Sequence, residues 1–406
     1  MIYYVFLFLE FLYPSFNNVF DLPYSSTVYR TLLLVLSVLV TIMFAKFVLK
    51  RNTSTKFILI IFTTLLISIF IGLTISKYNK LSYVALVNYS TFILRTIPSV
   101  FIVPILLEKS KNWHLQKIKI LYFFTGFSLL LFIIRNITTT FHWATINYGG
   151  INYNDFTFVS AINILFGIVL IENKIKTKTL SRTLFFVLLI LLLSFATLFL
   201  SAGRSGIISA IMIVVIFIFR NFINFRIKIS KFILSSFLIV VIFIFFSLLS
   251  RNSKFELVSA GLERAVGFIN LGNTGPLINW SNTSSRLPIY QDSLKLFFER
   301  PILGHGIGSV YMIHPTAYFS HNIFLDLLIE GGIMLLIIFI LIIFKSLLNY
   351  KKYEVTFHSE MSLYVLVLTF IKLFTGSNYL VEPLFFCSIV MLLMSGHKYK
   401  LNESKN

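Results

Sequence analysis

The amino-acid sequence predicts an all-α polytopic membrane protein, a bundle of about 12 transmembrane helices with a large, partly helical loop outside the cytoplasm. Of the 406 residues, 57% are hydrophobic and only 12% are charged, whereas soluble globular proteins carry roughly 25% charged residues. These polar side chains are too few to cover a soluble surface. Continuous apolar runs of about 20 residues recur along the chain, as in membrane helices, and lack the alternation of a membrane β-barrel.

The basic residues support the same fold class. The chain has 35 Lys and Arg against 15 Asp and Glu, a net charge of +20, but the basic residues form short clusters between apolar runs. We therefore expect no nucleic acid as a partner. The single cysteine, Cys387, lies inside an apolar run, which excludes an intrachain disulfide and a cysteine-based metal site. The N-terminus lacks a basic region and a cleavage site, so no removable signal peptide is expected.

Twelve segments have the length and apolar composition of membrane spans. The first is interrupted by Glu10 and Pro14, and the fourth contains Arg95 and two prolines, so both are expected to be bent or partly interfacial. The segments are 2–20, 31–49, 57–75, 83–107, 118–134, 156–172, 183–200, 205–219, 232–249, 331–348, 360–376 and 380–396.

Lys and Arg in the short loops predict the orientation of the bundle, because cytoplasmic loops carry an excess of positive charge. With both termini in the cytoplasm, 22 of the 35 basic residues fall in cytoplasmic segments. The loop 250–330 then lies on the opposite side, and it is neutral, with six basic and six acidic residues. The predicted organisation is therefore nine spans in 1–249, the external loop in 250–330, and three spans with a cytoplasmic tail in 331–406.

The external loop has the densest polar composition, and function is expected there because loops on a rigid scaffold carry chemistry. Its pattern predicts an amphipathic helix over Lys254–Ile269 and a second helix that starts after Ser284 or Ser285, with Pro288 in its first turn. A glycine-rich segment over 304–308 predicts a flexible turn. The apolar face expected for the second helix consists of Leu287, Tyr290, Leu294, Phe297 and Phe298.

Two arginines near the loop are suited to binding an anion. Arg204 lies in the tight turn Ser201–Gly206, where the chain leaves the membrane and at once re-enters it. Arg286 lies at the start of the second loop helix, where free amide groups and the helix dipole already favour an anion, and a guanidinium adds paired donors that match phosphate. The structural alternatives are a snorkelling cation at a helix end for Arg204 and a solvated helix-start residue for Arg286.

Polar residues also open the helix that enters the next predicted span. His321 precedes Asn322, and Asn322, Asp326 and Glu330 are spaced i, i+4 and i+8 on one helix face. His321 is the candidate base, since an imidazole titrates near neutral pH, although a histidine bonded to loop backbone has the same pattern. Asn322 suits a helix cap or a substrate ligand. Glu330 is expected to contact substrate, to orient His321 or Arg286, or to anchor the outer end of the span.

In order and position, these segments resemble the O-antigen polymerase and O-antigen ligase superfamily. The stretches are SAGRSG around Arg204, FFERPILGHGIGS after Arg286 and HNIFLDLLIEGGI from His321, and they flank a large external loop as in the family. The resemblance covers roughly residues 195–345. Gly203 stands before the first arginine, where serine is frequent in the family, and the N-terminal half has no matching motif.

The resemblance implies an enzyme of the bacterial inner membrane whose active site faces the periplasm. The reaction would transfer glycan from a polyprenyl-pyrophosphate donor to the hydroxyl of a lipid-linked acceptor, with inversion at the anomeric carbon. Arg204 and Arg286 would bind the diphosphate, and His321 would accept the proton of the hydroxyl. Arg95, a charge within a span, would line the groove for the lipid donor. A chain-length regulator and a flippase are the expected protein partners.

No metal or other cofactor is expected, because no Asp-x-Asp pair or His/carboxylate cluster in the sequence has ligand spacing. Within the family, we predict a polymerase of O-antigen or capsule repeat units, since the neutral external loop gives no special reason to expect lipid A core as the acceptor. A ligase that transfers finished polymer to lipid A core uses the same three residues. Outside the family, a flippase or transporter would place polar residues near the midplane of two similar halves, and a membrane scaffold would need none of them.

Overall fold

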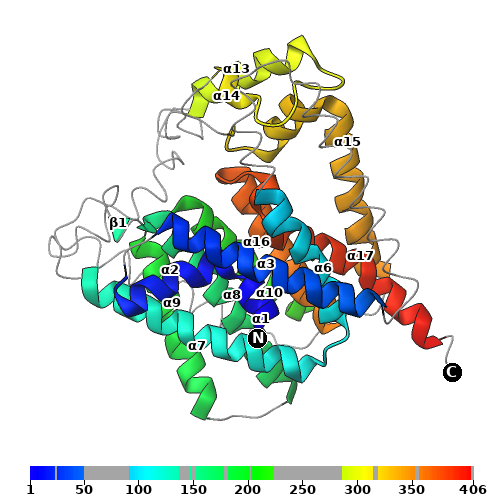
Figure 1. Ribbon diagram of the computed structural model, residues 1–406. Helices are drawn as coiled ribbons and strands as arrows, with labels where there is room; N and C mark the ends of the chain where they lie inside the picture. Colours follow the sequence, from blue (N-terminus) through cyan, green and yellow to red (C-terminus); the bar gives the residue numbers. More distant parts are fainter. Residues whose placement is uncertain are drawn as a thin grey trace. The chain divides into compact units, whose positions relative to one another are not determined.

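The computed structural model describes residues 1–22, 25–49, 91–136, 147–148, 151–177, 182–201, 203–223, 286–313, 319–352 and 356–403. The predicted spans 57–75 and 232–249 and the predicted helix Lys254–Ile269 lie outside these residues. Within them the regular secondary structure is helical except for one antiparallel strand pair, β1 (Asn147–Tyr148) and β2 (Ile151–Asn152) (Figure 1). The predicted all-α fold class is therefore confirmed.

The chain divides into two compact units. Unit 1 comprises Met1–Leu7, Thr27–Lys111 and Thr283–Asn406, and unit 2 comprises Phe8–Ser26 and Asn112–Asn282. Unit 1 carries α1 (Ile2–Leu7), α3 (Ser26–Leu49), η1 (Phe92–Thr96), α6 (Ile97–Leu107), α13 (Arg286–Glu299), α14 (Val310–Ile313), α15 (Ile323–Lys352), α16 (Phe357–Thr375), η5 (Tyr379–Val381) and α17 (Pro383–Glu403). Unit 2 carries α2 (Leu9–Phe20), α7 (Lys111–Asn136), the strand pair, α8 (Tyr153–Thr177), α9 (Arg182–Leu200) and α10 (Arg204–Ile223).

Nine of the twelve predicted spans coincide with apolar helices of the described residues. The predicted span 2–20 forms two helices, α1 and α2, instead of one. In the described part of the chain, five helices are long and apolar enough to cross a membrane: Thr27–Phe44, Lys111–Arg135, Asp155–Asn173, Ile323–Tyr350 and Phe357–Thr375. The shorter apolar helices found there are Phe92–Leu107, Thr183–Leu198, Ser205–Arg220 and Pro383–Met394.

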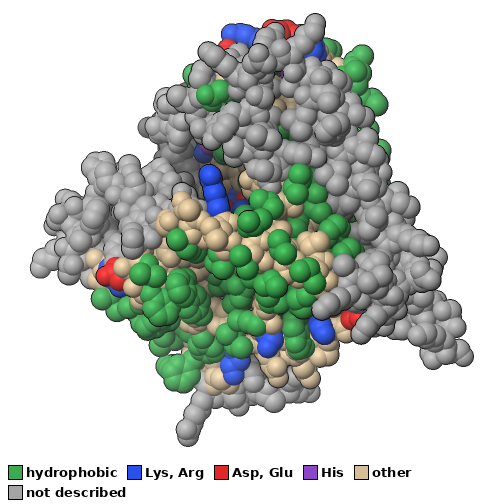
Figure 2. All heavy atoms as spheres, in the orientation of Figure 1, with side chains coloured by type: hydrophobic (Ala, Val, Ile, Leu, Met, Phe, Trp, Pro, Cys, Tyr) green, Lys and Arg blue, Asp and Glu red, His purple; other side chains and the backbone are tan. Residues whose placement is uncertain are grey.

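The outer surfaces of these helices are apolar. Phe185 on α9 and Leu341 on α15, for example, are 65% and 59% exposed. Figure 2 shows hydrophobic side chains over much of the described surface on one face, with charged side chains at only a few places. A soluble protein rarely exposes apolar side chains on this scale, whereas lipid accepts them. The chain is therefore a polytopic helical membrane protein.

Buried polar contacts join the helices within each unit. In unit 2, Arg220 of α10 forms an ion pair of 2.6 Å with Glu172 of α8. In unit 1, Thr96 donates a hydrogen bond of 2.7 Å to the carbonyl oxygen of Leu380, which holds η1 beside the segment that precedes α17. The free cysteine, Cys387 of α17, is buried and donates a hydrogen bond of 3.0 Å to the carbonyl oxygen of Ser99 in α6. Such bonds have no competing water in an apolar medium, so they help to specify how the helices pack.

Candidate functional site

Arg286 is the first residue of α13, and the predicted helix is confirmed, with Pro288 in its first turn. Proline is tolerated there because no intrahelical bond needs its missing N–H. The Nη1 atom of Arg286 donates a hydrogen bond of 2.6 Å to the carbonyl oxygen of Thr375, the last residue of α16. Carbonyls at a helix C-terminus lack helical partners and attract cations. The bond therefore fixes the direction of the guanidinium.

The strip of α13 that packs against the protein is narrow and differs from the apolar face expected from the sequence. The buried residues of the helix are Ser293 and Leu296, and Leu296 packs with Ile329 of α15. From the predicted face, Leu294 and Phe298 are 42% and 72% exposed. An interfacial helix can leave large apolar side chains to lipid and pack against the protein through a narrower strip.

The glycine-rich turn after α13 docks on a break in α15. The backbone of α15 leaves helical geometry at Gly332, where φ is 64° and ψ is −167°. A break leaves the carbonyls before it without helical partners. The carbonyl oxygens of Ile329 and Glu330 instead accept hydrogen bonds of 2.7 and 2.9 Å from the amides of His305 and Gly306. The turn thus replaces the missing bonds of the helix.

The contact between this turn and α15 leaves no room for a side chain at the glycines on either side. Beyond the break, the amide of Ile333 donates a bond of 2.8 Å to the carbonyl oxygen of Pro301. A Cβ atom at Gly304, where φ is +67°, would lie 2.6 Å from the backbone of α15, and one at Gly332 would overlap the carbonyl of Ile302. The turn is buried and hydrogen-bonded, so the prediction of a flexible turn is wrong. We call residues 301–308 together with 329–333 the glycine joint.

The turn that carries His321 is held on both sides. The backbone of His321 is left-handed, with φ 63°, which is uncommon for a residue with a side chain and requires support from its surroundings. The amide of Ser320 donates a bond of 2.7 Å to Oδ1 of Asp326, and the Ser320 hydroxyl donates one of 2.9 Å to the carbonyl of Asn322. The Asn322 side chain in turn accepts a bond of 3.0 Å from the amide of Phe324. Asn322 therefore acts as a cap of α15.

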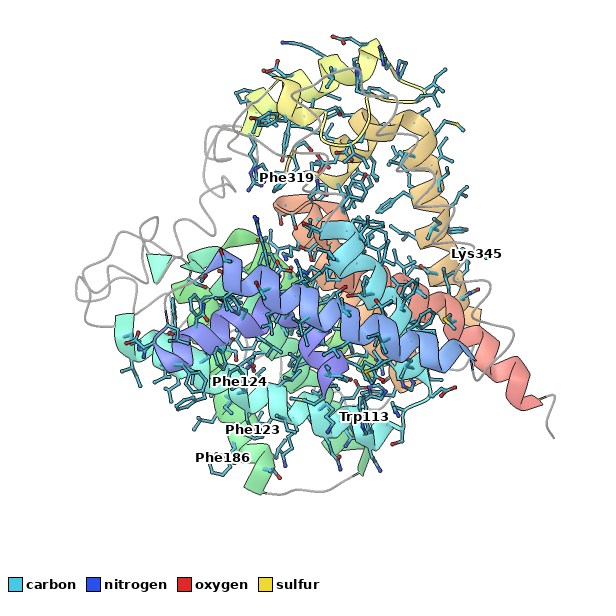
Figure 3. The ribbon with its side chains drawn as sticks, viewed as in Figure 1. Trp113, Phe123, Phe124, Phe186, Phe319 and Lys345 are labelled. Carbon is cyan, nitrogen blue, oxygen red and sulfur yellow. The ribbon has the colours of Figure 1, made fainter. Side chains whose placement is uncertain are left out.

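The imidazole of His321 is arranged to stay neutral. Its ring centroid lies 4.4 Å from that of Phe319, which is labelled in Figure 3. Within the described residues, the buried Nδ1 atom has no hydrogen-bond partner. Burial, and then the charge of Arg286, lower the pKa of His321 to about 4. A neutral imidazole keeps one unprotonated nitrogen, which is what a proton acceptor needs at neutral pH.

The turn between α16 and α17 brings a further residue, Gly376, next to both groups. A Cβ atom added there would lie 3.9 Å from Nη2 of Arg286 and 4.0 Å from Nδ1 of His321. Arg286 and His321, which are separated in sequence, therefore border one position. The sequence did not indicate this contact, because a glycine after a helix normally reads as its C-terminal cap.

Glu330 ties the glycine joint to the same turn. Its Oε1 atom accepts a bond of 2.8 Å from the amide of Gly308, and its Oε2 atom accepts one of 2.6 Å from the hydroxyl of Tyr379. Burial, followed by the carboxylate of Glu330, raises the pKa of Tyr379 well above its usual value, so this hydroxyl remains a donor. Among the described residues, Glu330 bonds these two groups and neither His321 nor Arg286, which favours the anchoring role.

A buried ion pair closes the turn between α16 and α17. Nζ of Lys372 lies 2.5 Å from Oε1 of Glu382, and the two side chains are 6% and 1% exposed. The hydroxyl of Ser377 donates a bond of 2.6 Å to the same carboxylate oxygen. Because a charge buried without a partner is costly, the pair holds the two ends of the turn together. The backbone on both sides of Gly376 is therefore fixed.

The two remaining arginines lie elsewhere in the chain. Arg95 is in η1 of unit 1 and is 6% exposed. Arg204 is the first residue of α10 in unit 2. The turn before Arg204 is held to α8, because Thr157 donates a bond of 2.9 Å to Ser201. The substrate-binding roles of Arg95 and Arg204 remain predictions.

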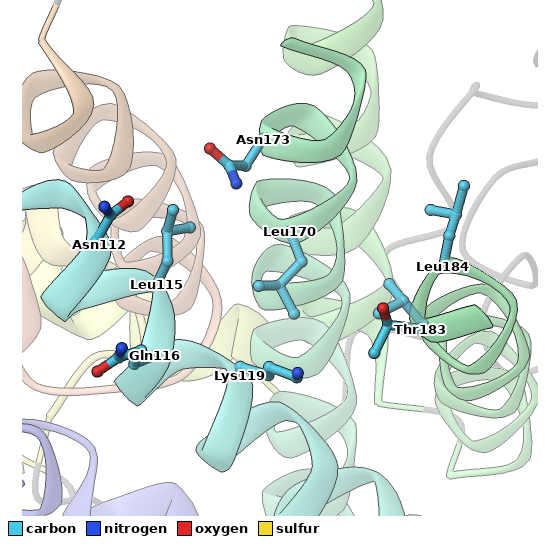
Figure 4. Close-up of a pocket in the computed structure, with 9 residues that line it drawn as sticks. Asn112, Leu115, Gln116, Lys119, Leu170, Asn173, Thr183 and Leu184 are labelled. Atoms are coloured by element: carbon cyan, nitrogen blue, oxygen red, sulfur yellow. The ribbon is translucent and has the colours of Figure 1, made fainter. Parts of the chain in front are cut away.

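The described residues contain no group of three or more His, Cys, Asp or Glu side chains that could hold a metal ion. A cavity of about 320 Å³ lies in unit 2, between α7, α8 and α9 (Figure 4). It contains none of the predicted site residues. Its lining consists of Asn112, Leu115, Gln116, Lys119, Leu170, Asn173, Thr183, Leu184 and Val187.

Comparison with known protein families supports the resemblance seen in the motifs. Residues 189–340 match the family model described as O-antigen ligase. This match spans the turn of Arg204, the start of α13, the glycine joint and His321, and it confirms the resemblance to the O-antigen polymerase and ligase superfamily. No curated protein matches the chain. The family match indicates a membrane enzyme of polysaccharide assembly with glycosyltransferase-like activity.

Proposed function

We propose that this chain, whose residues 189–340 match a family model described as O-antigen ligase, polymerises lipid-linked oligosaccharide repeat units of an O-antigen or capsule. The donor is a glycan on polyprenyl diphosphate, and the acceptor is a hydroxyl of another lipid-linked unit. The observation that carries this proposal is the position at Gly376, which a cationic guanidinium and a neutral imidazole border together. These are the two groups that such a transfer needs.

The reaction assigns one task to each group. The bond between the anomeric carbon and the phosphate oxygen breaks, and its electron pair stays on the diphosphate, where Arg286 stabilises the added charge. The acceptor oxygen forms the new bond to the anomeric carbon from the opposite face, which inverts that centre. The proton of the acceptor hydroxyl passes to His321. No oxidant or reductant is needed.

The position of the site along the helices supports a reaction at the membrane boundary. His321 lies two residues before the apolar span Ile323–Tyr350, and Gly376 directly follows the span Phe357–Thr375. A lipid-linked diphosphate places its charged group at that level, with the polyprenyl chain in the bilayer. Lys345, labelled in Figure 3, and Lys352 lie toward the other end of α15. Because Lys and Arg mark the cytoplasmic side, the site faces the periplasm of a bacterial inner membrane.

The description of the matching family favours a second candidate, an O-antigen ligase that transfers finished polymer to lipid A core. The same residues suit that reaction, because the donor and the leaving group are unchanged. The two candidates differ only in the acceptor, and therefore in the glycan that accumulates when the site is disabled.

Complementation of a strain that lacks the gene tests the proposal. Arg204→Ala, Arg286→Ala and His321→Ala are each expected to abolish long-chain glycan on gels of extracted polysaccharide. Single repeat units on lipid A core would identify a polymerase, and polymer retained on polyprenyl lipid with bare core would identify a ligase. Normal long-chain glycan from all three variants would refute both.

A cation on the same helix provides the matched control. Lys295 lies on α13 like Arg286, but it is 76% exposed, and among the residues that the structure describes it pairs with Asp292 on the surface. Surface pairs of this kind contribute about 0–1 kcal/mol to stability. Lys295→Ala should therefore give normal glycan at the same level of membrane protein, which separates the loss of a particular cation from the loss of any positive charge.

A further inference from the structure

Gly376 has no side chain, and the position that a Cβ atom would take there lies beside Arg286 and His321. Among the described residues outside its own chain neighbours, Nη2 of Arg286 and Nδ1 of His321 are the two atoms that lie within 4 Å of a Cβ built there. Gly376 itself is exposed. The space next to it is therefore bounded by the same two groups that the proposed reaction uses.

The backbone around Gly376 keeps this space in place. Arg286 bonds the carbonyl of Thr375 on one side, and Ser377 bonds Glu382 on the other. Beyond them, the hydroxyl of Tyr379 donates to Glu330 of α15. Because each neighbour of Gly376 is tied to a different element, the turn cannot move aside readily when a larger side chain is introduced.

The two bordering atoms are not used for other contacts in the described part of the site. The bond of Arg286 to Thr375 uses Nη1, whereas Nη2 is the atom nearest to the space. Nδ1 of His321 has no hydrogen-bond partner among the described residues. A phosphate oxygen can accept a bond from Nη2, and a hydroxyl can bond to the imidazole nitrogen. The space thus offers one partner for each end of a reacting sugar phosphate.

We infer that Gly376 shapes the substrate space of the site: its missing side chain leaves the space in which the sugar phosphate of the donor and the attacking hydroxyl meet between Arg286 and His321. This inference rests on the proposed function and adds to it a residue outside the segment 189–340 that matches the family. A side chain at position 376 would occupy the volume of the substrate while leaving both catalytic groups in place.

A series of side chains at this position tests the inference. Gly376→Ala adds a single carbon at ordinary contact distance, and it should lower the rate of glycan transfer by less than about tenfold. Gly376→Val and Gly376→Leu should lower the rate progressively, by more than about 100-fold for Leu, because the reacting groups can no longer approach. Equal rates of glycan transfer for the Ala, Val and Leu variants, in vesicles that hold equal amounts of protein, would overturn the inference.

A thiol at the same position tests the space without relying on activity. The natural Cys387 is buried, so the thiol of Gly376→Cys is the one expected to react with charged methanethiosulfonates. The anionic sulfonatoethyl reagent should react about fivefold faster than the cationic trimethylammonium reagent, because Arg286 lies beside the thiol. Inorganic pyrophosphate should slow the reaction by at least about threefold, and Arg286→Gln should remove the preference.

Phe298→Cys, on the exposed face of α13, is the matched control and should show neither the preference nor the protection. Equal rates for the two reagents at Gly376→Cys, or no effect of pyrophosphate, would overturn the inference. If Gly376→Cys prefers the anionic reagent but Arg286→Ala and His321→Ala give normal glycan, the proposed function is refuted, whereas an anion-binding space beside Gly376 is still supported. Normal glycan from Gly376→Leu, together with loss from Arg286→Ala, would leave the function and refute the role of Gly376.

Discussion

The two parts of α15 on either side of Gly332 show opposite patterns of burial. In the first part, Ile323–Gly331, Asp326 and Glu330 are 0% and 5% exposed, although both are acidic. In the second part, Ile333–Lys352, Ile337 and Leu341 are 48% and 59% exposed, although both are apolar. One helix thus buries its acidic side chains near the site and exposes its apolar side chains where lipid is expected.

The difference shows what the glycine joint does for function. An unbroken helix would carry the lipid-facing part straight into the turn of His321. The break at Gly332 lets the turn 301–308 bond to the backbone of α15, which fixes α13, and with it Arg286, relative to the first part of α15. The glycines of the joint therefore hold Arg286 and the turn of His321, which carry the two groups of the proposed reaction, on one backbone framework.

Gly332→Ala is expected to have the largest effect on this comparison. The left-handed φ of 64° and the overlap of a Cβ atom with the Ile302 carbonyl both oppose a side chain there. We expect a loss of at least about 3 kcal/mol in the stability of unit 1. The fall in thermal midpoint in detergent measures it. Ile337→Ala, on the exposed part, is the control, and an equal effect of the two substitutions would contradict the distinction between the two parts.

The membrane location of the second part can be tested with a charge. Ile338 is 48% exposed, and Lys at the centre of a span costs about 2.5–3.5 kcal/mol in apparent insertion free energy. Ile338→Lys should therefore reduce the fraction of correctly inserted protein, whereas Ile338→Leu should not. Glycosylation mapping of the loops on either side measures insertion. Unchanged insertion of Ile338→Lys would mean that lipid does not cover this face of α15.

The fold could be predicted well from the sequence, because the constraint that lipid places on the backbone applies to each segment separately. An apolar run such as Ile333–Leu348 must form a helix wherever it packs, since its backbone groups have no other partner in hydrocarbon. The start of α13 could be predicted for the same reason, because the preference for proline in a first helical turn depends on neighbouring residues alone. The face of α13 that packs against the protein could not be predicted, because it depends on the surface that α15 presents.

The site was predictable only in part for the same reason. Arg286 and His321 stand next to recognisable motifs, and the structure places both beside one position. Gly376 and Tyr379 follow no motif, and they reach the site because α16 returns the chain to the start of α15. Contacts of that kind depend on tertiary packing, which a linear pattern does not contain.

The contact between Glu330 and Tyr379 should have an intermediate effect. Tyr379→Phe leaves one buried carboxylate oxygen without its donor, which costs about 1–3 kcal/mol. In the background of Glu330→Gln, the same substitution should cost less, because the carboxylate is already gone. A double-mutant cycle of thermal midpoints measures the coupling. Additive effects of the two substitutions would mean that the 2.6 Å bond between them does not hold the turn to α15.

The smallest expected effect concerns pH. A histidine with an ordinary pKa near 6.5 loses about tenfold of its neutral form between about pH 7.5 and 5.5, whereas the lowered pKa of His321, about 4, keeps it neutral over that range. Diethyl pyrocarbonate modifies the neutral imidazole, so the intrinsic rate at His321 should change by less than about a factor of 2. Arg286→Gln removes one cause of the lowered pKa of His321, and the modification rate should then fall more steeply as the pH is lowered.

Mass spectrometry of the peptide that contains His321 measures the modification rate, with the same peptide free in solution as the control. A tenfold fall in the folded protein would mean that burial and the charge of Arg286 do not hold the imidazole of His321 neutral.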